Sequence, residues 1–389
     1  MNTRVFVDDP YHFYDALRAS NPISKGTLLK YPGWYVTGYD EAVAILKDSR
    51  FLTRSPLPQT RKKYKNLKTI QKDMLLFKNP PNHTRLRMLV GKAFTPRVLE
   101  QYRTYMEETV HQLLDQVQEK KTMDVVSDLA FPLASFIIAK IIGVPEKDRH
   151  LFRIWAVTLI ETIDFTRSIN TLANGDHITE RLVDYFKELI KERRQSPKVD
   201  LISMLINEKN GDNLTDDELV STCILLVIAG HETTVNLISN SVYCLLNHPK
   251  QLKMLKETPA LMENAVEEFL RYESPTQMTA RFASEDIKIS NHLIKKGEQV
   301  YLLLGAVNRD PKKFFKPNQL DITRNPNPHL AFGYGIHFCL GSTLARLEAQ
   351  TVLRVFLRRI PDFQFASSEL KWRKLIGFRA LQELPIHFN

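Results

Sequence analysis

The sequence predicts a fold that is mainly α-helical with a smaller β portion. Three observations favour this fold class: amphipathic segments fill residues 98–210, an apolar run extends over 215–246, and a last helical pattern covers 340–359. Strand patterns occur in the first quarter of the chain and in residues 281–305. Because 43% of the 389 residues are hydrophobic, the chain can bury a sizeable core.

The first quarter mixes short strands with helices. A strand is predicted over 34–37, directly after a Pro-Gly pair, and a helix over 39–47, where apolar residues recur at helical spacing. A further helix is predicted over 82–90, between Pro81 and Pro96.

The clearest helix begins at Thr215. Thr215 and Glu218 have the spacing of a capping box, and the two residues after Thr215 are aspartates, which suit the first turn of a helix. The apolar pattern continues to Leu246 and ends before Pro249. A helix of roughly 30 residues is about 45 Å long, and its apolar character on nearly all sides predicts that it is buried.

The second β region changes to the shorter period of strands. Residues 287–289 and 299–304 are predicted as strands around Lys296-Gly297. A proline-rich segment without regular structure is predicted over 311–328.

No linker, repeat or change of composition divides the chain, so a single domain over 1–389 is expected. The N-terminus lacks a signal pattern, and no stretch approaches the roughly 20 apolar residues of a membrane span, so a cytoplasmic protein without membrane attachment is expected. The cysteines are Cys223, Cys244 and Cys339. Three cysteines argue against a disulfide framework and exclude a zinc or iron–sulfur site of four cysteines.

The chain carries a formal net charge of +10. One basic cluster lies early in the chain: Arg61, Lys62, Lys63, Lys65, Lys68 and Lys72. A solvated surface is the simpler interpretation of such a cluster, and attraction of an acidic partner is the functional one. Nucleic acid is not expected as a partner, because base-reading motifs and interleaved aromatic residues are missing.

The strongest functional signal is the segment 332–341, Phe-Gly-Tyr-Gly-Ile-His-Phe-Cys-Leu-Gly, which precedes the last predicted helix. Its glycines permit backbone conformations that side chains forbid and can bring N–H groups near the sulfur of Cys339. The positive end of a helix dipole favours the thiolate of a cysteine at the helix N-terminus. An isolated cysteine in a glycine-rich turn is more often a buried structural residue, so the assignment depends on the whole segment.

In every fixed position this segment resembles the cysteine-ligand loop of the cytochromes P450, Phe-Gly-x-Gly-x-His-x-Cys-x-Gly. The resemblance implies the cytochrome P450 fold with a long central helix over haem, haem b as cofactor and Cys339 as the iron ligand. It places Phe332, His337 and Gly341 in the haem site and implies a monooxygenase that uses O2 and external electrons. Cys223 and Cys244 lack such a context and are interpreted as core residues.

Further motifs resemble the same family in the same order. Glu268 and Arg271 match its Glu-x-x-Arg helix, which implies a structural role in a buried polar network. His83 and Arg87 stand four residues apart and match its His-x-x-x-Arg helix, which binds haem propionates. Arg281 is similar to a further propionate contact, as His337 is. Four cations around one dianionic edge are electrostatically consistent.

Residues 229–234, Ala-Gly-His-Glu-Thr-Thr, interrupt the apolar character of the long helix. Glycine costs roughly 1 kcal/mol inside a helix relative to alanine, so its presence requires a reason. The resemblance implies that the helix opens locally over the haem, that Thr233 hydrogen-bonds the dioxygen substrate and that Glu232 relays protons. The role of His231 stays open, and an ordinary polar position within the helix is the alternative for the segment.

At finer detail the chain resembles the biotin-operon, pimelate-forming P450s of bacilli. This implies oxidation of long acyl chains, as free fatty acids or on acyl carrier protein, with cleavage inside the chain. It also implies an apolar substrate pocket, although general core packing is the alternative for each member: Leu57, Met74, Leu75, Leu76, Phe77, Leu225, Ile228, Ala229, Thr276, Gln277, Met278 and Phe378.

The chain has no redox module of its own, so a ferredoxin or flavodoxin is expected as electron donor to a monomeric enzyme. Simple hydroxylation of fatty acids, macrolides or terpenoids is the rival activity. A non-catalytic haem-thiolate sensor is the rival of another class, and Glu232 and Thr233 argue against it because a passive binder needs no proton relay.

Overall fold

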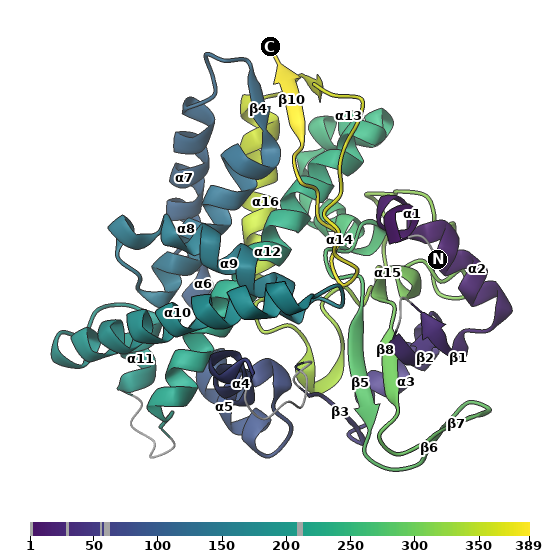
Figure 1. Ribbon diagram of the computed structural model, residues 1–389. Helices are drawn as coiled ribbons and strands as arrows, with labels where there is room; N and C mark the ends of the chain where they lie inside the picture. The colour runs from purple at the N-terminus through teal and green to yellow at the C-terminus, as the bar shows by residue number, and fades with distance from the viewer. Residues whose placement is uncertain (1–2, 29–30, 55–56, 58–62, 208–212) are drawn as a thin grey trace. The chain divides into compact units, whose positions relative to one another are not determined.

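The structure is a computed structural model that describes residues 3–28, 31–54, 57, 63–207 and 213–389 (Figure 1). The predicted fold class, mainly α with a smaller β portion, is confirmed. The α-helices are α1 (Thr3–Asp8), α2 (Tyr11–Ser20), α3 (Tyr39–Lys47), α4 (Lys65–Asp73), α5 (Asn82–Gly91), α6 (Pro96–Glu100), α7 (Arg103–Asp115), α8 (Phe131–Ile142), α9 (Leu151–Ile163), α10 (Ile169–Gln195), α11 (Leu201–Ile206), α12 (Asp216–Asn247), α13 (Pro249–Glu257), α14 (Met262–Tyr272), α15 (Leu304–Val307) and α16 (Ser342–Arg359).

Short helical turns and strands connect these helices. The turns are η1 (Leu75–Phe77), η2 (Lys92–Phe94), the π-helical η3 (Val125–Ala130), η4 (Glu146–Asp148), η5 (Pro259–Leu261) and η6 (Gly335–His337). The strands are β1 (Ile23–Leu28), β2 (Tyr31–Val36), β3 (Phe51–Leu52), β4 (Thr122–Asp124), β5 (Thr279–Ala283), β6 (Ile287–Ile289), β7 (His292–Ile294), β8 (Gln299–Leu302), β9 (Phe363–Phe365) and β10 (Pro385–Phe388).

The chain divides into two compact units, each assembled from separate segments. Unit 1 comprises Met1–Leu52, Glu107–Ala130 and Thr233–Asn389, and unit 2 comprises Thr53–Met106 and Phe131–Glu232. The boundary between Glu232 and Thr233 lies inside α12. A single domain over 1–389 therefore stays a prediction.

Unit 1 contains the sheets. Its largest sheet has the order β1-β2-β8-β5-β3, in which β2 and β8 run parallel and the other pairs run antiparallel. Figure 1 shows β5 and β8 side by side. The apolar residues Trp34 and Val36 are buried in β2, as are Val300 and Leu302 in β8, and they join the core beneath this sheet.

Unit 2 is built from helices, and a buried ion pair fixes two of them. The long helix α10 packs against α9, α4 and α11. Arg193 of α10 donates through Nε to Asp200 Oδ2 at 2.5 Å and through Nη2 to the Gly143 carbonyl at 2.5 Å, and its side chain is 2% exposed. The Asp200 carboxylate also caps α11 by accepting from the Ser203 N–H at 2.7 Å.

The predicted capping box at the start of α12 is confirmed. Thr215 N–H donates to Glu218 Oε2 at 3.0 Å, and Glu218 N–H donates to Thr215 Oγ1 at 3.2 Å. The helix then continues for 32 residues, close to the predicted length. The capped start of α12 and its length could therefore be predicted from local sequence.

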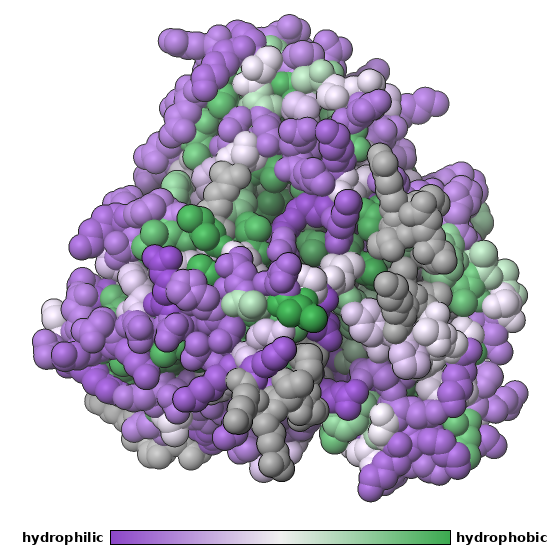
Figure 2. Space-filling view, viewed as in Figure 1, coloured by the Kyte–Doolittle hydropathy of each residue, from purple (hydrophilic) through white to green (hydrophobic). Residues whose placement is uncertain are grey.

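Two segments, Val125–Ile142 and Asp216–Asn247, are long and apolar enough to cross a membrane by length and composition alone. The expectation that no stretch approaches a membrane span is therefore wrong on that criterion. Most of each apolar window is buried, 67% and 78% respectively, as in the core helices of soluble proteins. Hydrophilic residues predominate on the outer surface of the face shown in Figure 2.

The predicted strands were right in position but incomplete in pairing. Residues 287–289 form β6, and its antiparallel partner is β7, which was not predicted. The strand predicted over 299–304 ends at Leu302, where the chain turns into α15, and it pairs with β5 and β2. The proline-rich segment 311–328 has neither helix nor strand, as predicted.

Candidate active site

The segment around Cys339 is a tight loop that leads into α16. Gly333 and Gly335 have φ of +73° and +72°, a region that side chains disfavour. A Cβ on Gly335 would also collide with the carbonyl oxygen of Leu46. The Cys339 N–H donates to the Phe332 carbonyl at 2.9 Å, which closes the loop on itself. The predicted need for both glycines is confirmed.

Cys339 is exposed in this loop, three residues before α16 begins at Ser342. This position places the thiol by the positive end of the helix dipole, which favours its ionised form. Cys223 and Cys244 differ, because both are buried in α12 and burial raises the pKa of each thiol. Their interpretation as core residues is confirmed.

The Glu268–Arg271 pair lies at the centre of a buried hydrogen-bonded network. Arg271 donates through Nε and Nη2 to the two carboxylate oxygens of Glu268, both at 2.8 Å, and neither side chain is exposed. Arg271 also donates to the carbonyls of Asn308 at 3.0 Å and Pro317 at 2.8 Å.

Glu268 receives three further hydrogen bonds from the proline-rich segment. They come from the Asp321 N–H at 2.9 Å, Arg324 Nε at 3.0 Å and Asn327 Nδ2 at 3.0 Å. The pair therefore ties α14 to the segment that leads to the Cys339 loop.

Arg281 is a buried cation. It lies in β5, is 8% exposed, and donates through Nη1 to the Ala280 carbonyl at 2.8 Å. Desolvation lowers the pKa of its guanidinium to about 10. No carboxylate of the described residues forms an ion pair with it, so an anionic group of a ligand would complete its environment. This observation fits a haem propionate.

In the middle of α12, one face is more accessible than the buried residues around it. Leu225, Ala229 and Thr233 follow one another at a spacing of four, so they share a face. Ala229 is exposed, and Leu225 and Thr233 are half-buried, whereas Ile228 and Glu232 are buried. The predicted catalytic threonine therefore lies on an accessible stripe in the middle of this helix.

The expected local opening of α12 at residues 229–234 does not interrupt the helix, which is continuous from Asp216 to Asn247. Close packing explains Gly230 instead. A Cβ at this position would stand 2.8 Å from Cδ1 of Ile138 in α8. His231 is 1% exposed and its ring packs edge-on against Phe131, with centroids 4.0 Å apart. A core role for His231 follows.

The predicted site residues are divided between the two units. Unit 2 carries His83 and Arg87 on α5, where His83 is 1% exposed and Arg87 is half-buried. It also carries Glu232 and the pocket candidates from Leu57 to Ala229. Unit 1 carries Cys339, Arg281, Thr233 and the candidates from Thr276 to Phe378.

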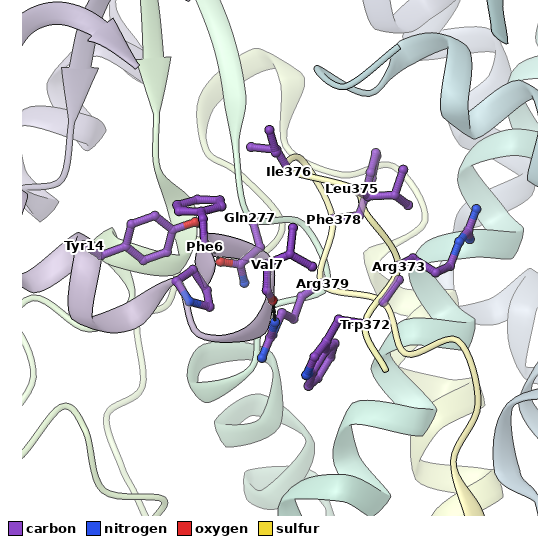
Figure 3. Close-up of a pocket in the computed structure, with 12 residues that line it drawn as sticks. Phe6, Val7, Tyr14, Gln277, Trp372, Arg373, Leu375, Ile376, Phe378 and Arg379 are labelled. Carbon is purple, nitrogen blue, oxygen red and sulfur yellow. Dashed lines mark hydrogen bonds between the residues drawn. The ribbon is translucent and has the colours of Figure 1, made fainter. Parts of the chain in front are cut away.

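Most of the predicted pocket residues are buried or half-buried, but Leu76 is 42% exposed. Gln277 is occupied within the protein. It accepts a hydrogen bond from the Tyr14 hydroxyl at 3.1 Å and donates to the Ser274 carbonyl at 2.8 Å. Figure 3 shows Tyr14 and Gln277 pointing toward one another in a small pocket that Phe378 also lines. Gln277 therefore has little capacity left for a substrate.

The same pocket reveals a role for Arg379 that sequence reasoning missed. Its guanidinium stacks on Trp372 at 3.3 Å from the ring centroid and donates through Nε to Glu273 at 2.6 Å. It also donates to the Val7 carbonyl (Figure 3) and to the Asp8 carbonyl, both at the end of α1. The chain beside Phe378 is thus anchored to the N-terminal helix.

A second missed cluster joins Glu267, His329 and Arg346. Arg346 donates to Glu267 through Nε at 2.6 Å and Nη2 at 2.8 Å, and His329 Nε2 lies 3.1 Å from Glu267 Oε2. Glu267 is next to Glu268, which the sequence analysis identified, and Arg346 lies seven residues after Cys339. No local sequence pattern, however, indicates that Glu267 and Arg346 contact each other.

Comparisons with known proteins agree with this geometry. A family model described as cytochrome P450 matches residues 147–374. The biotin biosynthesis cytochrome P450 of Bacillus subtilis (strain 168) is 61% identical over 384 residues, which cover 99% of this chain and 97% of the relative. The polyketide biosynthesis cytochrome P450 PksS of the same strain is 39% identical over 99% of this chain and 97% of its own length.

A solved structure is also very similar, the crystal structure of P450BioI in complex with hexadec-9Z-enoic acid ligated acyl carrier protein. It superposes with a TM-score of 0.97 at 59% identity and covers 100% of both chains. The family match over more than half of the chain and relatives at these identities over nearly all of it lead to one conclusion: this chain belongs to the cytochrome P450 family.

Proposed function

We propose that the protein oxidises long acyl chains, free or carried by acyl carrier protein, and cleaves them within the chain to pimelate or a pimeloyl carrier for biotin synthesis. The observation that carries this proposal is the 61% identity, over 99% of the chain, to a biotin biosynthesis cytochrome P450. The near-identical fold of P450BioI, solved with an acylated carrier protein, supports a carrier-bound substrate.

As a cytochrome P450, the protein is a monooxygenase that binds haem b. Haem with an axial thiolate activates dioxygen for insertion into C–H bonds. Cys339 supplies that thiolate in our proposal, with Phe332 and Gly341 in the loop beside it. The buried cation Arg281 binds a propionate, together with His83, Arg87 and His337. The uncompensated guanidinium of Arg281 supports this assignment most directly.

Thr233 and Glu232 deliver protons to the dioxygen substrate in this proposal. Thr233 lies on the accessible stripe of α12 and presents a hydroxyl to the dioxygen substrate, and Glu232 is the adjacent acid, 3% exposed. A hydroxyl and an acid joined by a few waters pass protons singly while bulk water stays out.

Replacing Thr233 by alanine is expected to preserve haem binding but to divert electrons into hydrogen peroxide. Product formed per NADPH consumed should fall by about tenfold, because the hydroxyl that positions the proton is lost. NADPH oxidation, peroxide and product are measured together with surrogate redox proteins.

Thr234→Ala is the matched control for this variant. Thr234 is 3% exposed and lies beside the buried Glu348, whose pKa is raised by burial even though the Thr234 hydroxyl partly offsets that effect, so Thr234 belongs to a buried face of α12. Thr234→Ala should retain coupling. Equal product per NADPH in Thr233→Ala and the unmodified protein would exclude the relay role.

The substrate pocket is proposed to be apolar, as an alkyl chain requires. Candidates that combine apolar character with at least partial burial support it, among them Met74, Phe77 and Met278. We assign Gln277 to the protein's own hydrogen bonding.

The basic cluster is proposed to attract the acidic carrier protein. Arg61 and Lys62 lie outside the described residues. Lys65 and Lys72 are exposed on α4 and Lys68 is half-buried there, while Leu67 and Ile70 of the same helix are buried. The helix thus presents a basic face opposite its apolar one. Such a face raises the encounter rate with an acidic partner.

Changing Lys63, Lys65 and Lys72 together to glutamine is expected to weaken binding of acylated carrier protein by about tenfold at low salt. The difference should shrink above 0.1 M salt, where screening acts within about 10 Å. Calorimetric titration of carrier-bound and free acyl chains measures the effect.

A second triple variant, with Lys250, Lys253 and Lys288 changed to glutamine, removes the same charge from exposed positions elsewhere. It should bind carrier-bound substrate normally. Equal weakening by both variants, or no dependence on salt, would argue against local steering by the basic cluster.

Electrons come from outside the chain in this proposal, from an acidic ferredoxin or flavodoxin that docks on the Cys339 side of a cytoplasmic, monomeric enzyme.

Spectral titration with free and carrier-bound acyl chains, followed by mass analysis of products, tests the proposed function. A seven-carbon diacid supports cleavage, which requires hydroxylation of two adjacent carbons before the bond between them breaks. Hydroxy acids alone favour simple hydroxylation. Absence of any substrate-dependent product under good electron supply favours a sensor.

A further inference from the structure

The ring of Phe332 is held from several sides at the start of the Cys339 loop. The guanidinium of Arg346 lies 4.5 Å from its centroid, and the rings of His329 and Phe338 lie 6.0 and 6.2 Å away. The carbonyl of the same residue accepts the Cys339 N–H at 2.9 Å. Whatever fixes Phe332 therefore also fixes the backbone of Cys339.

The segment between these two residues is only partly restrained by its own backbone. Gly333 and Gly335 both have positive φ and lack side chains that would restrict the backbone. Tyr334, Ile336 and Phe338 are 38%, 48% and 37% exposed, so solvent covers much of each side chain. Besides the close packing of Gly335 against the Leu46 backbone, the geometry of the loop therefore depends on anchors at its ends.

Arg346 is itself fixed by a carboxylate on another helix. Its fork donates to both oxygens of Glu267 in α14, at 2.6 and 2.8 Å, which defines the plane of the guanidinium over Phe332. His329 Nδ1 accepts the Ala331 N–H at 3.2 Å, so the ring donates to Glu267 through Nε2, at 3.1 Å. Glu267 thus orients both neighbours of the Phe332 ring.

Glu267 stays ionised at any working pH. Burial raises the pKa of its carboxyl, but hydrogen bonds from Arg346 and His329 outweigh that effect and hold the pKa at about 2. Because the folded-state pKa is depressed, the stabilisation from this cluster is complete above the ordinary glutamate range near pH 4.5 and is lost only as the pH falls toward about 2.

We propose that Arg346, oriented by Glu267 and His329, is a positioning residue that holds Phe332 and, through its carbonyl, the Cys339 backbone, and so sets the geometry of the sulfur ligand. This inference rests on the haem-thiolate part of the proposed function and not on the acyl substrate. Arg346 contacts neither substrate nor cofactor in this role and acts through Phe332.

The same two helices offer a matched control. Arg354 of α16 and Glu263 of α14 form an ion pair at 3.9 Å, with side chains 44% and 73% exposed. The pair joins α14 to α16 but contacts no aromatic ring of the loop among the described residues. Arg354→Lys therefore changes an arginine on the same helix without touching Phe332.

The test compares Arg346→Lys with Arg354→Lys in the haem-loaded protein. Lysine keeps the charge but loses the planar fork and the stacking surface. Two properties are measured: the reduction potential by spectroelectrochemical titration, and the rate at which the ferrous carbonyl complex converts to the short-wavelength form that has lost its thiolate. The conversion rate is measured at a temperature below the thermal unfolding midpoint of each variant, so that unfolding does not contribute to it.

Arg346→Lys is expected to shift the potential and to speed conversion about fivefold, as loss of one such contact implies. Arg354→Lys should change neither property. Glu267→Gln should reproduce Arg346→Lys, and the double variant should add nothing further, because both residues act through one contact.

Equal behaviour of Arg346→Lys and Arg354→Lys would overturn the proposal, as would additive effects of Arg346→Lys and Glu267→Gln. If Arg346→Lys fails to fold, His329→Gln replaces it, since glutamine can still donate to Glu267 but has no ring; an unchanged potential in that variant also overturns the proposal. No thiolate spectrum in the unmodified protein would refute the haem-thiolate assignment itself, whereas absent acyl binding would leave this inference standing.

Discussion

Replacing Cys339 by alanine is expected to abolish the red-shifted Soret band that thiolate ligation gives to the ferrous carbonyl complex. Alanine cannot ligate iron, and the nearest regular element, α16, supplies no second cysteine. Without the electron density that the thiolate donates, O–O bond cleavage is no longer favoured, so monooxygenase activity should fall below detection. Absorption spectra of the reduced, CO-treated protein measure the first effect and product analysis the second.

Cys223→Ala is the control for loss of a thiol. Cys223 is fully buried in α12 and burial raises the pKa of its thiol, so it stays protonated and packs as a small apolar group. This variant should keep the red-shifted band, with a modest loss of stability from the cavity. A band that persists in Cys339→Ala would refute the ligand assignment.

Replacing Glu268 by glutamine is expected to cause the largest loss of stability. Arg271 and Arg324 would keep their charges with side chains 0% and 10% exposed, and the carboxylate that compensates them would be gone. Breaking a buried pair in this way costs about 3–5 kcal/mol, a large part of the stability of an ordinary domain. The midpoint of urea unfolding and the yield of soluble, haem-loaded protein measure the effect.

Glu263→Gln is the comparison, because this glutamate is 73% exposed and its arginine partner stands 3.9 Å away. Exposed pairs of this kind contribute about 0–1 kcal/mol, so the unfolding midpoint should hardly change. Similar losses in the two variants would contradict a special role for the buried network.

Local sequence was sufficient to predict the long helix and the conformation of the cysteine loop. The capping box at Thr215 and Glu218 and the length of α12 depend on contacts within a few residues, so pattern and spacing suffice to predict them. The same holds for the loop, where Gly333 and Gly335 adopt the positive φ that their residue type suggested. The expected opening in α12 failed because the reason for Gly230 is its close approach to Ile138, a contact that no local pattern encodes.

The buried Glu268–Arg271 pair was predictable from the sequence only in part. Its spacing of three made the contact between the two side chains predictable, and the structure confirms it at 2.8 Å. Its further partners lie 37 to 59 residues away in the chain, from Asn308 to Asn327. Only the path of the proline-rich segment brings those groups to it.

The sequence by itself determined the fold class, the extent of the long helix and the cysteine proposed to ligate the haem, because the signal for each lies in residues that are neighbours along the chain. Tertiary structure alone decided that β2 pairs in parallel with β8 and that Arg379 donates hydrogen bonds to the end of α1. It also decided that Glu267 orients Arg346 over Phe332. Except for Arg346 with Phe332, these contacts join residues 79 to more than 300 positions apart. Their geometry follows from packing of the whole core, which periodicity and local propensity do not describe.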